Sequence, residues 1–121
     1  MRKLSEIERK WIEDIFKADF KDKDVLIMQV QHCLVTPTYN SGFISLKFHV
    51  DFEEKYLHSV RVPVEMRVFL KDRAPIVFLI HVIQGYLDEL EIFSADGSEI
   101  DVEKMLIDKI EYVVDPVVSC K

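Results

Sequence analysis

Residues 76–93 read IVFLIHVIQGYLDELEIF and contain the clearest structural signal in the chain. Two runs of strand-forming residues flank Gln84-Gly85, a two-residue loop of the kind that joins antiparallel strands, and Gly85 can adopt the positive φ of such turns. The first run, residues 76–83, is almost continuously apolar, which is typical of a central strand covered on both faces. Residues 86–93 form its partner. The sequence therefore predicts an antiparallel hairpin at the centre of a sheet.

The two-residue loop also predicts the register of the hairpin. The expected opposed pairs are Ile83 with Tyr86, Val82 with Leu87, His81 with Asp88, and Ile80 with Glu89. A carboxylate that accepts a ring N–H selects the tautomer of a histidine and raises its basicity, so His81 and Asp88 could serve general base chemistry. The same pair is also an ordinary cross-strand contact, and local spacing places no nucleophile or second acid beside it. We assign no catalytic residue and retain His81 and Asp88 as candidate binding residues.

Glu89 and Glu91 are two residues apart on one strand, so their carboxylates are expected to be neighbours on the face opposite to His81 and Asp88. Such a pair could bind a cation or share a proton, but it more commonly forms a solvated acidic strip. The functional interpretation is an acidic contact for a basic protein. Glu89 and Glu91 therefore complete the set of candidate binding residues.

Two helices are predicted before the strands. Ser5 can cap the first helix and Glu8 can reach back to the Ser5 amide, and apolar residues then recur at helical spacing, so this helix is expected over residues 5–18. A second, shorter helix is expected to begin near Lys23, with Asp22 or Asp24 as its cap, and to end before Pro37.

Further extended segments surround the hairpin. Residues 34–39 contain Pro37, which cannot donate a ladder hydrogen bond and predicts an edge strand. Residues 43–51 alternate cleanly, and residues 60–70 alternate around Pro63, which indicates an edge or a bulge. Residues 101–114 fit either a helix or a strand. We predict a single α+β domain over residues 1–121, with two N-terminal helices packed on a mostly antiparallel sheet of about five strands.

Composition narrows the classes of function. The chain has 16 Lys and Arg against 22 Asp and Glu, and its net charge of −6 is opposite to the charge that nucleic-acid binding uses. Its longest apolar run is far shorter than the ~20 residues of a membrane helix, and it begins without a signal-peptide pattern, so we expect a cytoplasmic protein. Cys33 and Cys120 are widely separated, and the scattered histidines show no recurrent ligand spacing. We expect no metal, and no cofactor because phosphate-cradling motifs are absent.

The block from His81 to Ser98 resembles a group of small, uncharacterised bacterial proteins that end in a hairpin of the form H-V-x-x-G-x-L-x-E-L-E-I-F-x-x-D-G. The opening at residues 4–8 is also similar to theirs. This resemblance implies a bacterial origin and a fold shared with domains of unknown function, and it transfers no catalytic residue. Small acidic proteins of this kind are often suspected of being immunity proteins that neutralise a toxin, which is an association by fold and size.

Three functions follow as hypotheses. The first is a non-enzymatic, acidic protein-binding module, with an immunity-like toxin inhibitor as one form, in which Asp88, Glu89 and Glu91 meet a basic partner. The second is a small-ligand-binding or catalytic domain that uses His81 and Asp88 beside the sheet. The third is a self-associating module that forms a homodimer through an edge strand, either the strand that contains Pro37 or the strand at residues 60–70.

Overall fold

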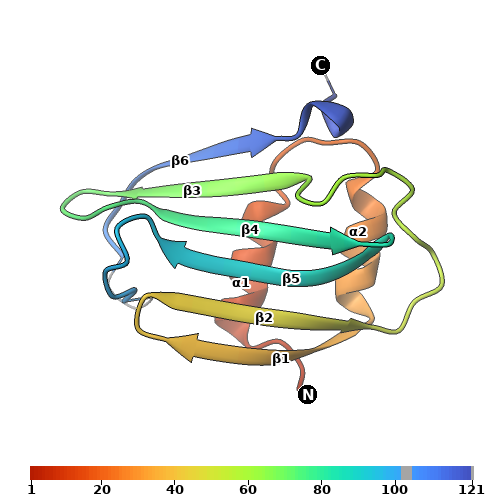
Figure 1. Ribbon diagram of the computed structural model, residues 1–121, viewed down its shortest axis with the longest axis horizontal. Helices are drawn as coiled ribbons and strands as arrows, with labels where there is room; N and C mark the ends of the chain where they lie inside the picture. Colours follow the sequence, from red (N-terminus) through yellow and green to blue (C-terminus); the bar gives the residue numbers. More distant parts are fainter. Residues whose placement is uncertain (102–104, 121) are drawn as a thin grey trace.

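The computed structural model describes residues 1–101 and 105–120, in which two helices precede six strands (Figure 1). The elements are α1 (Glu6–Ile15), α2 (Lys23–Gln31), β1 (Cys33–Asn40), β2 (Phe43–Val50), β3 (Val64–Leu70), β4 (Ile76–Ile83), β5 (Tyr86–Ser94), β6 (Ile107–Val114) and the short 3-10 helix η1 (Pro116–Val118). The α+β class is confirmed. The sheet has six strands rather than about five, because residues 101–114, whose sequence fitted either a helix or a strand, contain the strand β6. Residues 102–104 of that segment lie outside the described part of the chain.

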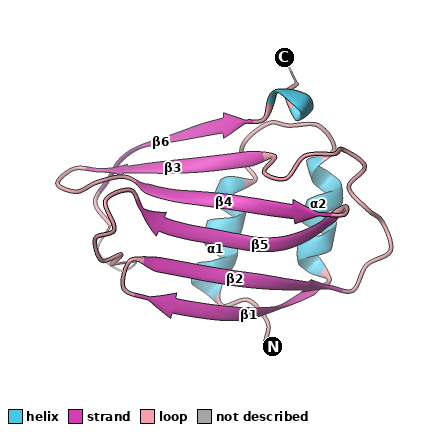
Figure 2. Cartoon of the chain, in the orientation of Figure 1, coloured by secondary structure: helices cyan, strands magenta, loops and turns pink. Residues whose placement is uncertain are grey.

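The strands form one antiparallel sheet in the order β1-β2-β5-β4-β3-β6. Both helices lie on the same face of this sheet (Figure 2), where buried side chains such as Ile15, Leu26 and Phe78 form the core. Trp11 packs edge-on against Phe78 with ring centroids 6.2 Å apart, which anchors α1 on the central strand β4. The opposite face carries no helix in the described chain, and we call it the open face. β4 is central as predicted, but its two faces are not both covered.

Helix α1 begins as the sequence predicts. The Ser5 hydroxyl accepts the Glu8 amide N–H at 3.3 Å, and the Glu8 carboxylate accepts the Ser5 amide N–H at 2.9 Å, which completes a capping box. The helix ends at Ile15, earlier than the expected residue 18. The Lys23 ammonium donates to the carbonyls of Phe16 and Ala18, both at 3.0 Å, and so provides partners for backbone acceptors that the helix leaves free.

Helix α2 holds the β4–β5 turn through a buried glutamine. The Gln29 amide nitrogen donates to the carbonyls of Gly85 at 2.9 Å and Glu54 at 3.1 Å, while its oxygen accepts the Leu87 amide N–H at 2.8 Å. Asp22, one of the two predicted caps, occupies the N-cap position of α2, but with a φ of 57° its side chain makes no cap hydrogen bond. Its carboxylate instead lies 2.7 Å from His58 Nε2.

The two edges of the sheet differ. β1 is an edge strand, as Pro37 predicts, and Arg2 covers part of this edge through two backbone hydrogen bonds with Val35, at 2.9 and 2.7 Å. The strand predicted over residues 60–70 is β3, which lies inside the sheet between β4 and β6, so the prediction of an edge there is wrong. Pro63 does not interrupt the ladder because it precedes the first residue of β3. The second edge is β6.

Candidate functional site

The register of the β4–β5 hairpin differs from the prediction after two residue pairs. Ile83 pairs with Tyr86 and Val82 with Leu87, as expected. The register then shifts, so that His81 pairs with Glu89 and Ile80 with Leu90, and Asp88 becomes the extra residue of a β-bulge. The predicted opposition of His81 and Asp88, and of Ile80 and Glu89, is therefore wrong.

Burial of apolar side chains explains the bulge. Leu87, Leu90 and Ile92 are all buried on the helix-covered face, although Leu87 and Leu90 are an odd number of residues apart. A regular strand would have turned Leu87 to one face and Leu90 and Ile92 to the other, because successive side chains alternate. The bulge places all three leucine and isoleucine side chains in the core. The break in alternation at Leu87-Asp88-Glu89-Leu90 was the sequence signal for it.

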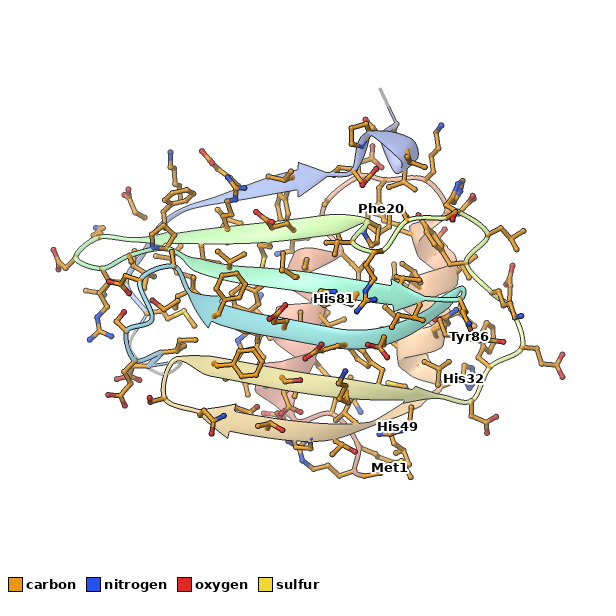
Figure 3. The ribbon with its side chains drawn as sticks, viewed as in Figure 1. Met1, Phe20, His32, His49, His81 and Tyr86 are labelled. Atoms are coloured by element: carbon orange, nitrogen blue, oxygen red, sulfur yellow. The ribbon has the colours of Figure 1, made fainter. Side chains whose placement is uncertain are left out.

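The bulge also brings three of the four predicted residues onto one face. His81, Glu89 and Glu91 lie together on the open face, and His81 Nε2 lies 2.9 Å from Glu91 Oε1. Figure 3 shows His81 over the central strands on this side of the sheet. The expectation that Glu89 and Glu91 occupy the face opposite to His81 is thus corrected. Asp88, at the bulge, contacts Lys47 at 3.4 Å rather than His81.

Strand β2 supplies two residues that sequence reasoning did not include in the site. The Ser45 hydroxyl donates to Glu89 Oε2 at 2.5 Å, and the Lys47 ammonium lies 3.5 Å from Glu89 Oε1. Ser45 pairs with Glu91 and Lys47 with Glu89 across the β2–β5 ladder. Polar and apolar residues alternate over residues 43–51, so Ser45 and Lys47 are expected on the same, polar face of their strand. The pairing of β2 with β5 is what places them beside the glutamates.

The hydrogen bonds of His81 define its tautomer. Arg61 Nε donates to His81 Nδ1 at 3.4 Å, so Nδ1 is an acceptor and the ring proton resides on Nε2, from which it is donated to Glu91. Both ring nitrogens are therefore engaged by neighbouring side chains. This arrangement links Arg61, His81 and Glu91 into a chain of polar contacts and leaves no free ring nitrogen to accept a proton from a substrate. We call His81, Glu89, Glu91, Ser45, Lys47, Asp88 and Arg61 the polar cluster.

An apolar row adjoins the polar cluster. Phe43 pairs with Phe93, and Phe93 pairs with Val77, so these three half-buried side chains cross the open face from β2 to β4. In the next row Leu79 stands between Glu91 on β5 and Glu65 on β3. The open face is therefore a flat surface on which apolar and acidic side chains alternate over the central strands.

Three cavities in the described residues, of about 600, 460 and 420 Å³, do not enclose the carboxylates of the polar cluster. Arg61 lines the second cavity, but none of the three has His81, Asp88, Glu89 or Glu91 in its wall. Among the described residues, no group of three or more His, Cys, Asp or Glu side chains is placed to hold a metal ion. The cluster consequently has the geometry of a contact surface rather than that of an enclosed site.

The largest of these cavities, of about 600 Å³, is a groove between α1 and α2. Its apolar lining includes Leu4, Ile12, Phe16, Ile27 and Val30, and Lys3, Arg9 and Glu13 contribute charged groups. Neither Lys3 nor Arg9 forms an ion pair with a described residue. Cys33 also lines the groove, and burial raises the pKa of its thiol to about 11.

No described helix is long and apolar enough to cross a membrane.

These observations define a small α+β domain with one sheet face covered by helices and one open face. The chain belongs to the family described as a domain of unknown function, DUF6984, whose model matches residues 1–105. Membership of an uncharacterised family agrees with the resemblance noted from the sequence. No curated protein and no solved structure gives a significant match.

Proposed function

We propose that this protein is a non-enzymatic module that binds a basic protein partner through the open face of its sheet. The observation that carries the proposal is the apolar row of Phe43, Phe93 and Val77 beside the carboxylates of the polar cluster, on a face that no described helix covers. An immunity-like toxin inhibitor is the specific form that we favour. Such a protein acts in the bacterial cytoplasm, a reducing compartment that suits the two free cysteines.

Charge and apolar area have different parts in this binding. Lys47 is shared between Asp88 and Glu89, and the polar cluster has three carboxylates, Asp88, Glu89 and Glu91, against the two cations Lys47 and Arg61, so carboxylates exceed these cations across the centre of the face. This excess and the net charge of −6 would steer a basic partner toward the chain and raise its association rate. The apolar row would then lose its contact with water, which favours the bound state.

Charge reversal on the open face tests the proposal. Wild-type protein and the Glu89→Lys/Glu91→Lys variant serve as baits in the native host at low salt, and the affinity for the recovered partner is measured with purified components. The control is Glu6→Lys/Asp24→Lys, which makes the same change in net charge at exposed positions of α1 and α2. We expect the open-face variant to lose about tenfold or more in affinity, while the control stays near wild type.

Two results would contradict the protein-binding proposal. One is the absence of any partner whose recovery depends on the open face. The other is equal affinity of the open-face variant and the helix control, because the acidic residues would then contribute only net charge and no local contact. Circular dichroism of both variants establishes that each is folded before affinities are compared.

A second candidate function is the binding of a small ligand in the groove between α1 and α2. The supporting observation is a volume of about 600 Å³ with apolar walls and two cations, Lys3 and Arg9, that have no described ion-pair partner. This combination suits an anion with an apolar tail. The ligand hypothesis based on His81 and Asp88 is less well supported, because the register separates the two residues and none of the three cavities is lined by either.

The groove is tested with two amphiphiles of opposite charge. Dodecanoate is expected to raise the melting temperature in a concentration-dependent manner, and dodecyltrimethylammonium is not, because a ligand that binds only the folded state stabilises it. Arg9→Glu should abolish the effect of dodecanoate, whereas Lys71→Glu, an exposed charge change at the β3–β4 turn, should preserve it. Equal responses to both amphiphiles would exclude a specific anion site.

A further inference from the structure

Strand β6 is a sheet edge with which no second described strand pairs, and it combines charged residues with exposed apolar ones. Ile107, Ile110 and Val113 are 50%, 38% and 45% exposed, and β6 contains no proline. The other edge, β1, is protected by Pro37 and by the backbone bridge from Arg2 to Val35. Exposed apolar edge strands are templates for pairing with another strand, and proteins usually blunt them.

The edge is already ordered for pairing. β6 pairs with β3 over most of its length, and the Tyr112 hydroxyl donates to the Asp14 carbonyl of α1 at 2.6 Å. A partner strand would therefore meet a strand that has already lost most of its conformational freedom. Pre-organisation of this kind lowers the entropic cost of association.

The sequence of β6 is complementary to itself when it is read in the opposite direction. Lys109 and Glu111 flank Ile110 symmetrically, so antiparallel pairing about Ile110 places Lys109 of each copy opposite Glu111 of the other. Lys109 and Glu111 lie on the same face, where they form an ion pair within one chain at 3.1 Å. Opposite charges in directly opposed cross-strand positions are favourable, and the two apolar Ile110 side chains would also meet.

We propose that β6 pairs with β6 of a second copy of this chain, antiparallel and centred on Ile110. The two-fold axis runs perpendicular to the sheet, which keeps the helices of both copies on one side and joins the two six-stranded sheets edge to edge. Pairing over residues 107–113 does not involve η1, which begins at Pro116. Leu106 and Val117, both exposed near opposite ends of β6, would be brought toward each other across the interface.

Sedimentation velocity over a range of protein concentrations tests the pairing. An interface of one strand pair is small, so we expect the wild-type chain to shift from monomer to dimer between about 1 and about 500 µM. Lys109→Glu and Glu111→Lys each create two like-charged cross-strand pairs, and either change should weaken dimerisation about tenfold to a hundredfold. Both substitutions lie beyond the residues that the family model matches.

Mixing the two variants is the decisive arm of this experiment. Lys109→Glu and Glu111→Lys are each expected to remain largely monomeric alone, but an equimolar mixture should dimerise as the wild type does, because opposite charges face each other again across the interface. The ion pair within each chain cannot be restored by mixing, so loss of folding stability cannot produce this recovery. Thr38→Lys, on the other edge strand, is the control and should dimerise normally.

Three results would overturn the proposed pairing. They are a wild-type chain that remains monomeric throughout the concentration range, single variants that dimerise as well as the wild type, and a mixture that stays as monomeric as its components. Backbone amide exchange gives an independent measure, since amides of residues 107–113 should exchange more slowly at high protein concentration in the wild type but not in either single variant alone.

Discussion

Replacing Glu8 with glutamine should remove a large, pH-dependent part of the stability of the fold. The Glu8 side chain has no exposed surface, and both of its oxygens accept hydrogen bonds from the Arg2 guanidinium at 2.7 Å. The Ser5 amide donates to the same carboxylate at 2.9 Å and the Tyr39 hydroxyl at 2.5 Å. This one side chain therefore connects the N-terminal segment, α1 and the edge strand β1.

The magnitude follows from the pKa of Glu8. Burial alone would raise this pKa, but the hydrogen bonds from Arg2, Tyr39 and the Ser5 amide outweigh burial and lower it from 4.5 to about 2. Lowering the pKa from 4.5 to about 2 corresponds to about 3 kcal/mol of stability, and partial solvent exposure of Arg2 reduces the expected value to about 2 to 3 kcal/mol. Because the folded-state pKa is depressed, this stabilisation is present above pH 4.5 and is lost as the pH falls toward 2.

Urea unfolding followed by the fluorescence of the single tryptophan, Trp11, measures this effect at several pH values from about 3 to 7. Glu8→Gln should lower the free energy of unfolding at pH 7 by about 2 kcal/mol and should flatten its dependence on pH in the acid range. Glu6→Gln, an exposed change in the same helical turn, should leave both quantities nearly unchanged. The reasoning would be refuted if Glu8→Gln kept the same acid dependence of stability as the wild type.

Three smaller perturbations test other parts of the fold. Gln29→Leu leaves the buried Leu87 amide without its acceptor and removes a donor from the carbonyls of Glu54 and Gly85, of which Gly85 keeps the Tyr56 amide as a partner, so it should lower the free energy of unfolding in urea by about 2 kcal/mol; a change below about 0.5 kcal/mol would contradict this role. Gly85→Ala places a methyl group 2.8 Å from a neighbouring side-chain carbon at a φ of +86°, whereas Gly97→Ala, at a φ of +76°, meets no atom within 4 Å, so the first change should reduce the melting temperature more. Because burial raises the pKa of Cys33 to about 11, iodoacetamide at pH 8 should alkylate it more slowly than the exposed Cys120, as read by peptide mass spectrometry.

Features encoded by residues close together in the sequence could be predicted well. The Ser5–Glu8 capping box and the Gln84-Gly85 turn each depend on a few neighbouring residues, and both are present in the structure; β2 also alternates as predicted, except that Ser45 is buried. Gln84 also adopts a positive φ, of 52°, which is the conformation that a two-residue turn of this type requires at both positions. Local chemistry was sufficient in these cases because no distant segment competes with it.

Features that depend on distant segments were predicted less well. Whether β3 is an edge strand is determined by β6, and the sequence of that later segment fitted a helix as well as a strand. The turn constrains only the two pairs nearest to it, and beyond them the buried positions of Leu87 and Leu90 set the register of β5. The candidate residues were therefore identified one by one, while their mutual arrangement required knowledge of which apolar side chains face the helices.

The two proposals, partner binding through the open face and pairing through β6, predict separable contributions to binding. A two-fold axis perpendicular to the sheet leaves the open faces of both copies on the same side, so the dimer would present two polar clusters on one continuous surface. A partner with repeated basic sites would then bind the dimer more tightly than a monomer, through avidity rather than through any new contact. Lys109→Glu should accordingly weaken binding of such a partner while leaving every residue of the polar cluster intact. Glu89→Lys/Glu91→Lys should instead weaken partner binding about tenfold or more without affecting dimerisation, so the two proposals can fail independently.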